Sequence, residues 1–142
     1  MKKFNFNIFL LLPIALCFIS CKKDSQTRRE NSLIGTWVET NLSSANSSIT
    51  FAKNKSFNLS TVYNVGAKTS ISGTYQVEGD RLKMNANERS DQQPGMDVVK
   101  RPASGEVFEA ATFSISGNIM TLKHISYPAD APYVMTSRFK KE

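Results

Sequence analysis

The side chains that could carry acid–base or metal chemistry are few and poorly grouped along this sequence. There is one histidine, His124, in a stretch typical of a strand, where a lone histidine is more often a packed or surface residue than a catalyst. Glu78 and Asp80 flank a glycine in a segment typical of a tight turn, and Glu106 and Glu109 would point to opposite faces of a strand. We therefore expect no enzyme, no catalytic residue, no metal site and no cofactor.

The two cysteines, Cys17 and Cys21, lie at the end of an N-terminal apolar stretch. Lys2 and Lys3 supply positive charge, residues 4–19 are mostly apolar, and a serine immediately precedes the second cysteine. This is the layout of a secretory signal whose apolar core is too short and too interrupted for a membrane span. An uncleaved N-terminal membrane anchor is the alternative interpretation.

Residues 16–21, Leu-Cys-Phe-Ile-Ser-Cys, resemble the lipobox of bacterial lipoproteins. The resemblance implies a signal peptide over residues 1–20, cleavage before Cys21, and a diacylglyceryl group with palmitate-type chains on its sulfur. It implies a protein of the bacterial cell envelope, anchored through this lipid to a membrane, which we expect to be the outer membrane. Cys17 would leave with the signal peptide, so the remaining chain would have neither a disulfide nor a free thiol.

The segment after the lipidation site is strongly polar. Residues 21–32 read as a lipidated flexible tether, because residues 22–31 have almost no apolar side chain to bury. The whole chain has a formal net charge of +6, but beyond this tether and the C-terminus the basic residues are scattered among acidic ones. A nucleic-acid binder would concentrate basic charge on one face with interleaved aromatic residues. We therefore expect a membrane surface, and no nucleic acid, as a partner.

Residues 33–142 read as a single all-β domain. Short runs of β-branched and aromatic residues are separated by Gly, Asn and Asp, and no segment of useful length has helical periodicity. Tight turns are predicted at 53–55, 78–80 and 116–118, where Gly and Asn supply the positive φ angles that such turns need. The predicted strands, approximate at their ends, are 35–41, 47–53, 56–63, 68–77, 81–86, 96–100, 106–115, 119–126 and 133–140.

Two of these hairpins repeat one another. Residues 74–80 align with residues 112–118, and the apolar residues of the two following strands align at the same offset. In both copies, strict alternation places the apolar side chains on one face of the sheet and the polar ones on the other. No helix is predicted to cover this face, so the sheet must close into a barrel or pack against a second sheet.

A second resemblance rests on Gly35, Trp37 and Arg138. A Gly-x-Trp motif at the head of a run of hairpins, with an arginine in the last strand, resembles the small bacterial lipocalin-like lipoproteins and the wider calycin pattern. It implies an antiparallel up-and-down meander of about eight strands, closed into a lipocalin-like β-barrel. It gives these three residues structural roles: the first and last strands would pair antiparallel, and the Arg138 guanidinium would pack on the Trp37 indole by a cation–π contact.

Two functions remain open for such a domain, which we expect to be a monomer. The first is binding of a small apolar or amphipathic ligand in the barrel, because eight-stranded barrels either hold one small ligand or are filled by their own side chains. The second is a non-enzymatic interaction or inhibitor protein that presents residues 85–105, the longest predicted irregular segment, to an envelope or host protein. The candidate ligand-binding residues, all expected to point inward, are Phe51, Phe57, Tyr75, Met84, Phe113 and Met120.

Overall fold

The computed structural model describes residue 24 and residues 26–40, 45–128 and 131–142. The predicted signal peptide and Cys21 lie outside the described residues, so cleavage and lipidation stay predictions. No helix in the described part of the chain is long and apolar enough to cross a membrane.

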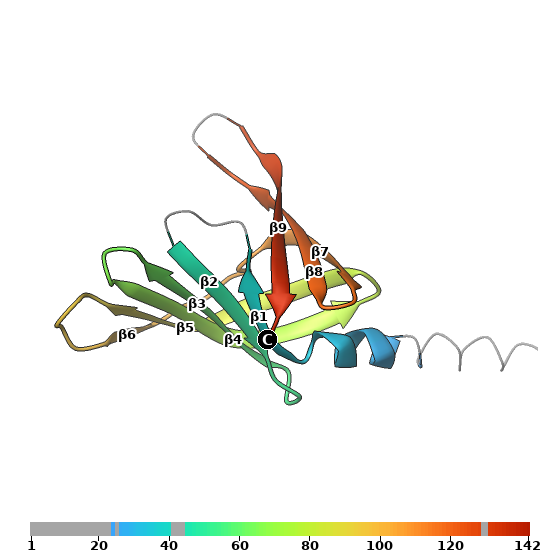
Figure 1. Cartoon of the computed structure of the whole chain (residues 1–142), viewed down its shortest axis with the longest axis horizontal. Helices are drawn as coiled ribbons and strands as arrows, with labels where there is room; N and C mark the ends of the chain where they lie inside the picture. The colour runs from blue at the N-terminus through green and yellow to red at the C-terminus, as the bar shows by residue number, and fades with distance from the viewer. Residues whose placement is uncertain (1–23, 25, 41–44, 129–130) are drawn as a thin grey trace, which may run out of the picture.

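Within the described residues, nine antiparallel strands form one sheet that closes on itself (Figure 1). The strands are β1 (Gly35–Glu39), β2 (Ala45–Phe51), β3 (Ser56–Tyr63), β4 (Lys68–Glu78), β5 (Arg81–Gln92), β6 (Val99–Pro102), β7 (Glu109–Ser116), β8 (Ile119–Ser126) and β9 (Tyr133–Lys141). β1 pairs with β2 and β9, and β5 pairs with β4 and β7, so eight strands close a barrel and β6 is an extra strand on β5. The predicted antiparallel barrel is confirmed, including the pairing of the first strand with the last.

The three predicted hairpin turns are confirmed, and each has a residue in the left-handed region. Gly79 in the β4–β5 turn has a φ of 64° and Gly117 in the β7–β8 turn 58°. In the β2–β3 turn Lys55 has the positive φ, 67°, so the prediction that Gly or Asn supplies it is wrong there. The repeated hairpins also place equivalent side chains alike, because Tyr75 and Phe113 are both buried inside the barrel. Local turn chemistry and alternation are therefore sufficient to define these hairpins.

The prediction of an irregular segment over residues 85–105 is wrong for most of its length. β5 continues to Gln92, and β6 returns along it from Val99, where strand 96–100 was predicted, to form a two-stranded ribbon. Lys100 Nζ lies 3.1 Å from Glu88 Oε1 across this ribbon. β6 is exposed along its whole length, and this end of β5 is exposed or half-buried. Because neither strand has to bury an apolar face here, the segment has no alternating pattern that would identify it as strand.

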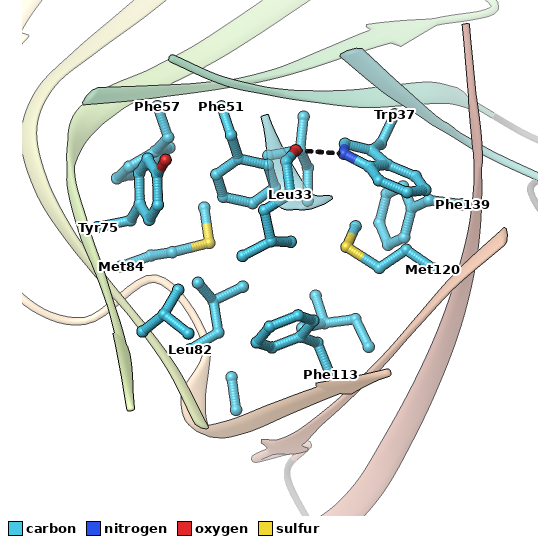
Figure 2. Packing of buried hydrophobic residues seen from close by; sticks show 14 residues of the cluster. Leu33, Trp37, Phe51, Phe57, Tyr75, Leu82, Met84, Phe113, Met120 and Phe139 are labelled. Carbon is cyan, nitrogen blue, oxygen red and sulfur yellow. Dashed lines mark hydrogen bonds between the residues drawn. The ribbon is translucent and has the colours of Figure 1, made fainter. Parts of the chain in front are cut away.

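Residues 26–33 form a helix at one end of the barrel, so the prediction of a flexible tether is wrong for residues 26–32. Gln26 Nε2 donates a hydrogen bond of 2.8 Å to the Val77 carbonyl oxygen, and Glu30 forms an ion pair with Lys55. Leu33, the last helical residue, is fully buried at the centre of the barrel core (Figure 2). One apolar residue and a few polar contacts dock this helix, which is why a polar composition did not reveal it.

Trp37 and Lys141 cap the C-terminal end of this helix. Trp37 Nε1 donates to the Leu33 carbonyl oxygen at 2.7 Å (Figure 2), and Lys141 Nζ donates to the Ser32 carbonyl oxygen at 3.1 Å. The last carbonyl groups of a helix have no intrahelical donor, and a positive charge there also complements the helix dipole. Side chains of the barrel wall therefore supply hydrogen-bond donors to the last carbonyl groups of the helix, which lies across this end of the barrel.

Lys141 occupies the place beside Trp37 that was predicted for Arg138. Lys141 Nζ lies 5.0 Å from the Trp37 ring centroid, and these two residues pair directly between β9 and β1. Arg138 is exposed, because Phe139 points inward and its immediate neighbours on the strand must point outward. The expected contact of Arg138 with the indole is therefore wrong.

Gly35 has a φ of 128°, and a Cβ there would lie 2.9 Å from Lys141 Cε, so a side chain would be strained and crowded.

Candidate functional site

The six candidate ligand-binding residues point into the barrel and belong to one cluster of buried side chains (Figure 2). The rings of Phe51 and Tyr75, for example, meet edge to face with their centroids 5.0 Å apart. Leu33 and Trp37 belong to the same buried cluster. A barrel of eight strands is narrow enough for side chains to fill. The six residues are not among the lining residues of the two pockets described below, so their contact with a ligand stays a prediction. The buried members of this set are Phe51, Phe57, Tyr75, Met84, Phe113 and Met120.

A pocket of about 290 Å³ opens at the end of the barrel opposite the helix. We call it the mouth pocket. Its volume lies near the lower end of the range for small-molecule sites. Its apolar lining residues are Ala45, Leu59, Phe108, Met135 and Phe139, and its polar ones are Glu39, Ser47, Thr61, His124 and Ser137.

The mouth pocket exists because the inward-facing positions change character along the strands. On β8 the inward series passes from Leu122, which is fully buried, to His124, which is half-buried. On β2 it passes from Ile49 to Ser47. Small or polar side chains at this end leave space that large apolar side chains occupy at the helix end. The result is a pocket with an apolar base and polar groups among its walls.

His124 is the residue of the mouth pocket that has a buried polar atom without a hydrogen-bond partner in the described structure. This atom is Nδ1 of the imidazole ring. The Phe108 ring packs on the imidazole with a centroid separation of 4.7 Å and a tilt of 48°. Burial lowers the pKa of His124 below its ordinary value, and the Glu39 carboxylate offsets part of this shift. The imidazole is therefore neutral at neutral pH, and its unpaired buried atom lowers stability.

The other polar groups of the mouth pocket are suited to hydrogen bonding. Ser47 Oγ and Thr61 Oγ1 lie 3.1 Å apart, within hydrogen-bond distance of each other. Glu39 is half-buried on β1, two residues beyond Trp37 and so on the same inner face. No group of three or more His, Cys, Asp or Glu residues that could hold a metal ion is found in the described part of the chain. This set of groups suits a small molecule with an apolar body and a polar head.

A second recess, of about 410 Å³, lies outside the barrel at the junction of β5 and β7. The register of these strands is a single pair, Arg81 with Thr112, and Ala110 has a φ of 51° at a bulge in β7. The charged residues that line this recess face outward and include both positive and negative side chains, for example Lys83 and Glu106. No buried polar side-chain atom without a partner lies there among the described residues. The mouth pocket is therefore the better candidate site.

Sequence reasoning missed His124 as a pocket residue, although a signal for it was present. His124 follows Met120 and Leu122 at the spacing of two residues that defines the inner face of β8. Extending this alternation by one further position would have placed the histidine inside the barrel. The polar inward positions of β2 and β9, Ser47 and Ser137, follow the same rule.

Comparison with known proteins finds no match for this chain among protein-family models, curated proteins or solved structures. The mouth pocket and the motifs of the sequence are therefore the features that bear on function.

Proposed function

We propose that this protein is a lipid-anchored, lipocalin-like lipoprotein of the bacterial cell envelope that binds a small apolar or amphipathic ligand in the mouth pocket. In this proposal it acts as a monomer and catalyses no reaction. The observation that supports binding most directly is the mouth pocket itself, in which apolar side chains such as Met135 and Phe139 lie beside the polar side chains of Glu39 and His124. The lipobox-like residues 16–21 support the anchor on Cys21.

The division of the barrel into two halves supports the same proposal. The helix end is filled and capped, so the barrel is stable without a ligand in its centre. The mouth pocket is open at the other end, so a ligand can enter without displacing the core. The β8–β9 hairpin, which stands away from the barrel in Figure 1, carries exposed apolar side chains beside this opening. Met135 of this hairpin lines the pocket, and Tyr133 and Val134 precede it in the chain.

Ligand binding is tested by filling the pocket. The purified protein would be titrated with fatty acids, sterols, alkyl amines and haem, and binding measured by displacement of a fluorescent probe. Thr61→Phe puts a bulky ring into the mouth pocket and should weaken binding at least tenfold. Its matched control is Val62→Phe, at the next residue of β3, whose side chain is exposed and faces outward. Absence of saturable binding throughout this library would reject the proposal.

The anchor is tested separately. Cys21→Ser should abolish lipidation, because a thioether to the diacylglyceryl group needs the cysteine sulfur. Cys17→Ser is the matched control, because Cys17 would leave with the signal peptide. Mass spectrometry of the N-terminus should find an acylated Cys21 in the unchanged protein and in the control. An unmodified chain that begins at another residue would reject the proposed localisation.

The ribbon formed by the end of β5 and by β6 supports a second candidate function, an interaction or inhibitor protein. Met96 at its turn is 66% exposed, and Val98 and Val99 are about half exposed. Pro94 of this turn lies beside Gly66 of the β3–β4 turn, so exposed Val65 adjoins the same surface. Exposed apolar side chains gathered on one surface are typical of protein contact sites. Photo-crosslinking from position 96 in intact cells, with position 78 as control, should give a specific adduct only if this function is correct.

A further inference from the structure

The electrostatic character of the mouth pocket differs from that of the whole chain. The chain has a formal net charge of +6, yet the lining residues include no lysine or arginine. With His124 neutral, Glu39 is the one lining residue in the described structure that carries a charge at neutral pH. A basic protein therefore contains a pocket whose own charge is negative.

Nothing described near the pocket neutralises Glu39. No ion pair is formed by this carboxylate in the part of the chain that the structure describes. On β9, Arg138 and Lys140 flank Phe139, the residue paired with Glu39, and both are exposed because they alternate with inward-facing neighbours. Lys123 on β8 is exposed for the same reason. Lys141 lies on the inner face, but its Nζ donates to the Ser32 carbonyl oxygen at the helix end. The undescribed residues 41–44 and 129–130 contain no lysine or arginine in their sequence.

The remaining walls would also favour a cation. Phe108 lines the pocket, and the face of an aromatic ring attracts an ammonium group. The hydroxyl groups of Ser47, Thr61 and Ser137 can accept hydrogen bonds from it. A carboxylate in the same place would meet the negative charge of Glu39 with no positive group to pair with. In a pocket of about 290 Å³, no part of a ligand can lie far from this charge.

We propose that the mouth pocket selects an apolar molecule with a protonated amino group, with Glu39 as the residue that determines this preference over an acid of the same shape. The inference rests on the proposed function, because it assumes that a small molecule enters the pocket. It adds the class of ligand, an aliphatic or aromatic amine. The apolar part would pack on Leu59, Met135 and Phe139, and the ammonium group would lie toward Glu39.

The test uses three ligands of one chain length: octylamine, 1-octanol and octanoate. Binding of each to the purified protein is measured by isothermal titration calorimetry at neutral pH and low salt. We expect octylamine to bind about tenfold or more tightly than octanoate, with octanol between them, because a partly buried carboxylate discriminates strongly between opposite charges. The difference should shrink as salt concentration rises.

Two variants assign the preference to one residue. Glu39→Gln keeps the shape of the side chain and removes its charge, so octylamine and octanoate should then bind within about threefold of each other. Glu78→Gln is the matched control, because this carboxylate is exposed at the helix end of the barrel. The control should keep the full preference of the unchanged protein.

The outcomes separate the inference from the function on which it rests. If octanoate binds as tightly as octylamine, or if Glu39→Gln keeps the preference for the amine, the inference is overturned while ligand binding stands. If none of the three compounds binds but another member of the library above does, the inference is overturned and ligand binding stands. If nothing in the library binds either, both are overturned. Because the three ligands are compared on the unchanged protein, that comparison does not depend on the folding of any variant.

Discussion

The helix end and the mouth end of this barrel are built from the same strands but differ in the side chains on their inner faces. At the helix end, Trp37, Phe51 and Leu33 are buried within a continuous cluster, and the helix carbonyls are capped. At the mouth, Glu39 and His124 are half-buried, and one imidazole nitrogen has no partner in the described structure. The large buried apolar side chains are thus concentrated in one half, while the other half has polar side chains on its inner face.

The largest expected effect is in the helix end. Trp37→Ala should lower the free energy of unfolding by about 3–5 kcal/mol, because it removes a fully buried ring and leaves a cavity. It also removes the donor to the Leu33 carbonyl group. The loss is a large part of the roughly 5–15 kcal/mol available to a domain. Urea denaturation followed by circular dichroism measures it. Arg138→Ala, at an exposed position, is the control and should change stability by less than about 0.5 kcal/mol.

A substitution in the mouth pocket should instead raise the free energy of unfolding. His124→Leu replaces an unpaired buried polar atom by an apolar side chain beside Phe108, and should raise the free energy of unfolding by about 1–3 kcal/mol. The same denaturation measurement checks it. Lys123→Leu, on the outer face of β8, should have almost no effect on stability. A destabilised His124→Leu variant would show that the histidine contributes to the core, and the contrast between the two halves would fail.

A smaller effect is expected from the contact that links the helix to the last strand. Lys141→Met keeps much of the apolar length of the side chain but removes its hydrogen bond to the Ser32 carbonyl group and its position over Trp37. The free energy of unfolding should fall by about 1 kcal/mol. Lys140→Met, whose side chain faces outward, is the matched control. Equal losses in the two variants would mean that the cap is not specific.

The smallest effect is a pH dependence from His124. Burial lowers the pKa of His124 in the folded protein below the ordinary histidine value, about 6.5. At pH values between the folded and the ordinary pKa, the unfolded chain therefore binds the proton and the folded protein does not. Stability from this group is therefore complete above about pH 6.5 and falls as the pH is lowered through this window. NMR titration of the single histidine gives its pKa directly. The slope of stability against pH in this window should be smaller in His124→Leu.

Features that depend on short stretches of chain could be predicted from the sequence. The turns at 53–55, 78–80 and 116–118 were predictable because Gly and Asn are common in tight turns, although in the first turn the left-handed residue is Lys55. Alternating strands with one apolar face, and no long helix to cover it, left closure into a barrel or packing against a second sheet. The resemblance that rests on Gly35, Trp37 and Arg138 implied the barrel. The ribbon at residues 85–102 escaped prediction because its two faces are similarly exposed.

Features that depend on the register between distant strands were decided only by the tertiary structure. The family resemblance placed Arg138 beside Trp37, but closure of the barrel pairs Trp37 with Lys141 and leaves Arg138 outside. The mouth pocket depends on the same relation, since Glu39, Thr61 and His124 come from three strands and share one space only after the barrel has closed. Alternation along a strand determines whether a side chain points into the barrel or outward. The stagger between neighbouring strands of the closed barrel determines how far along the barrel axis the side chain lies and which residues it contacts.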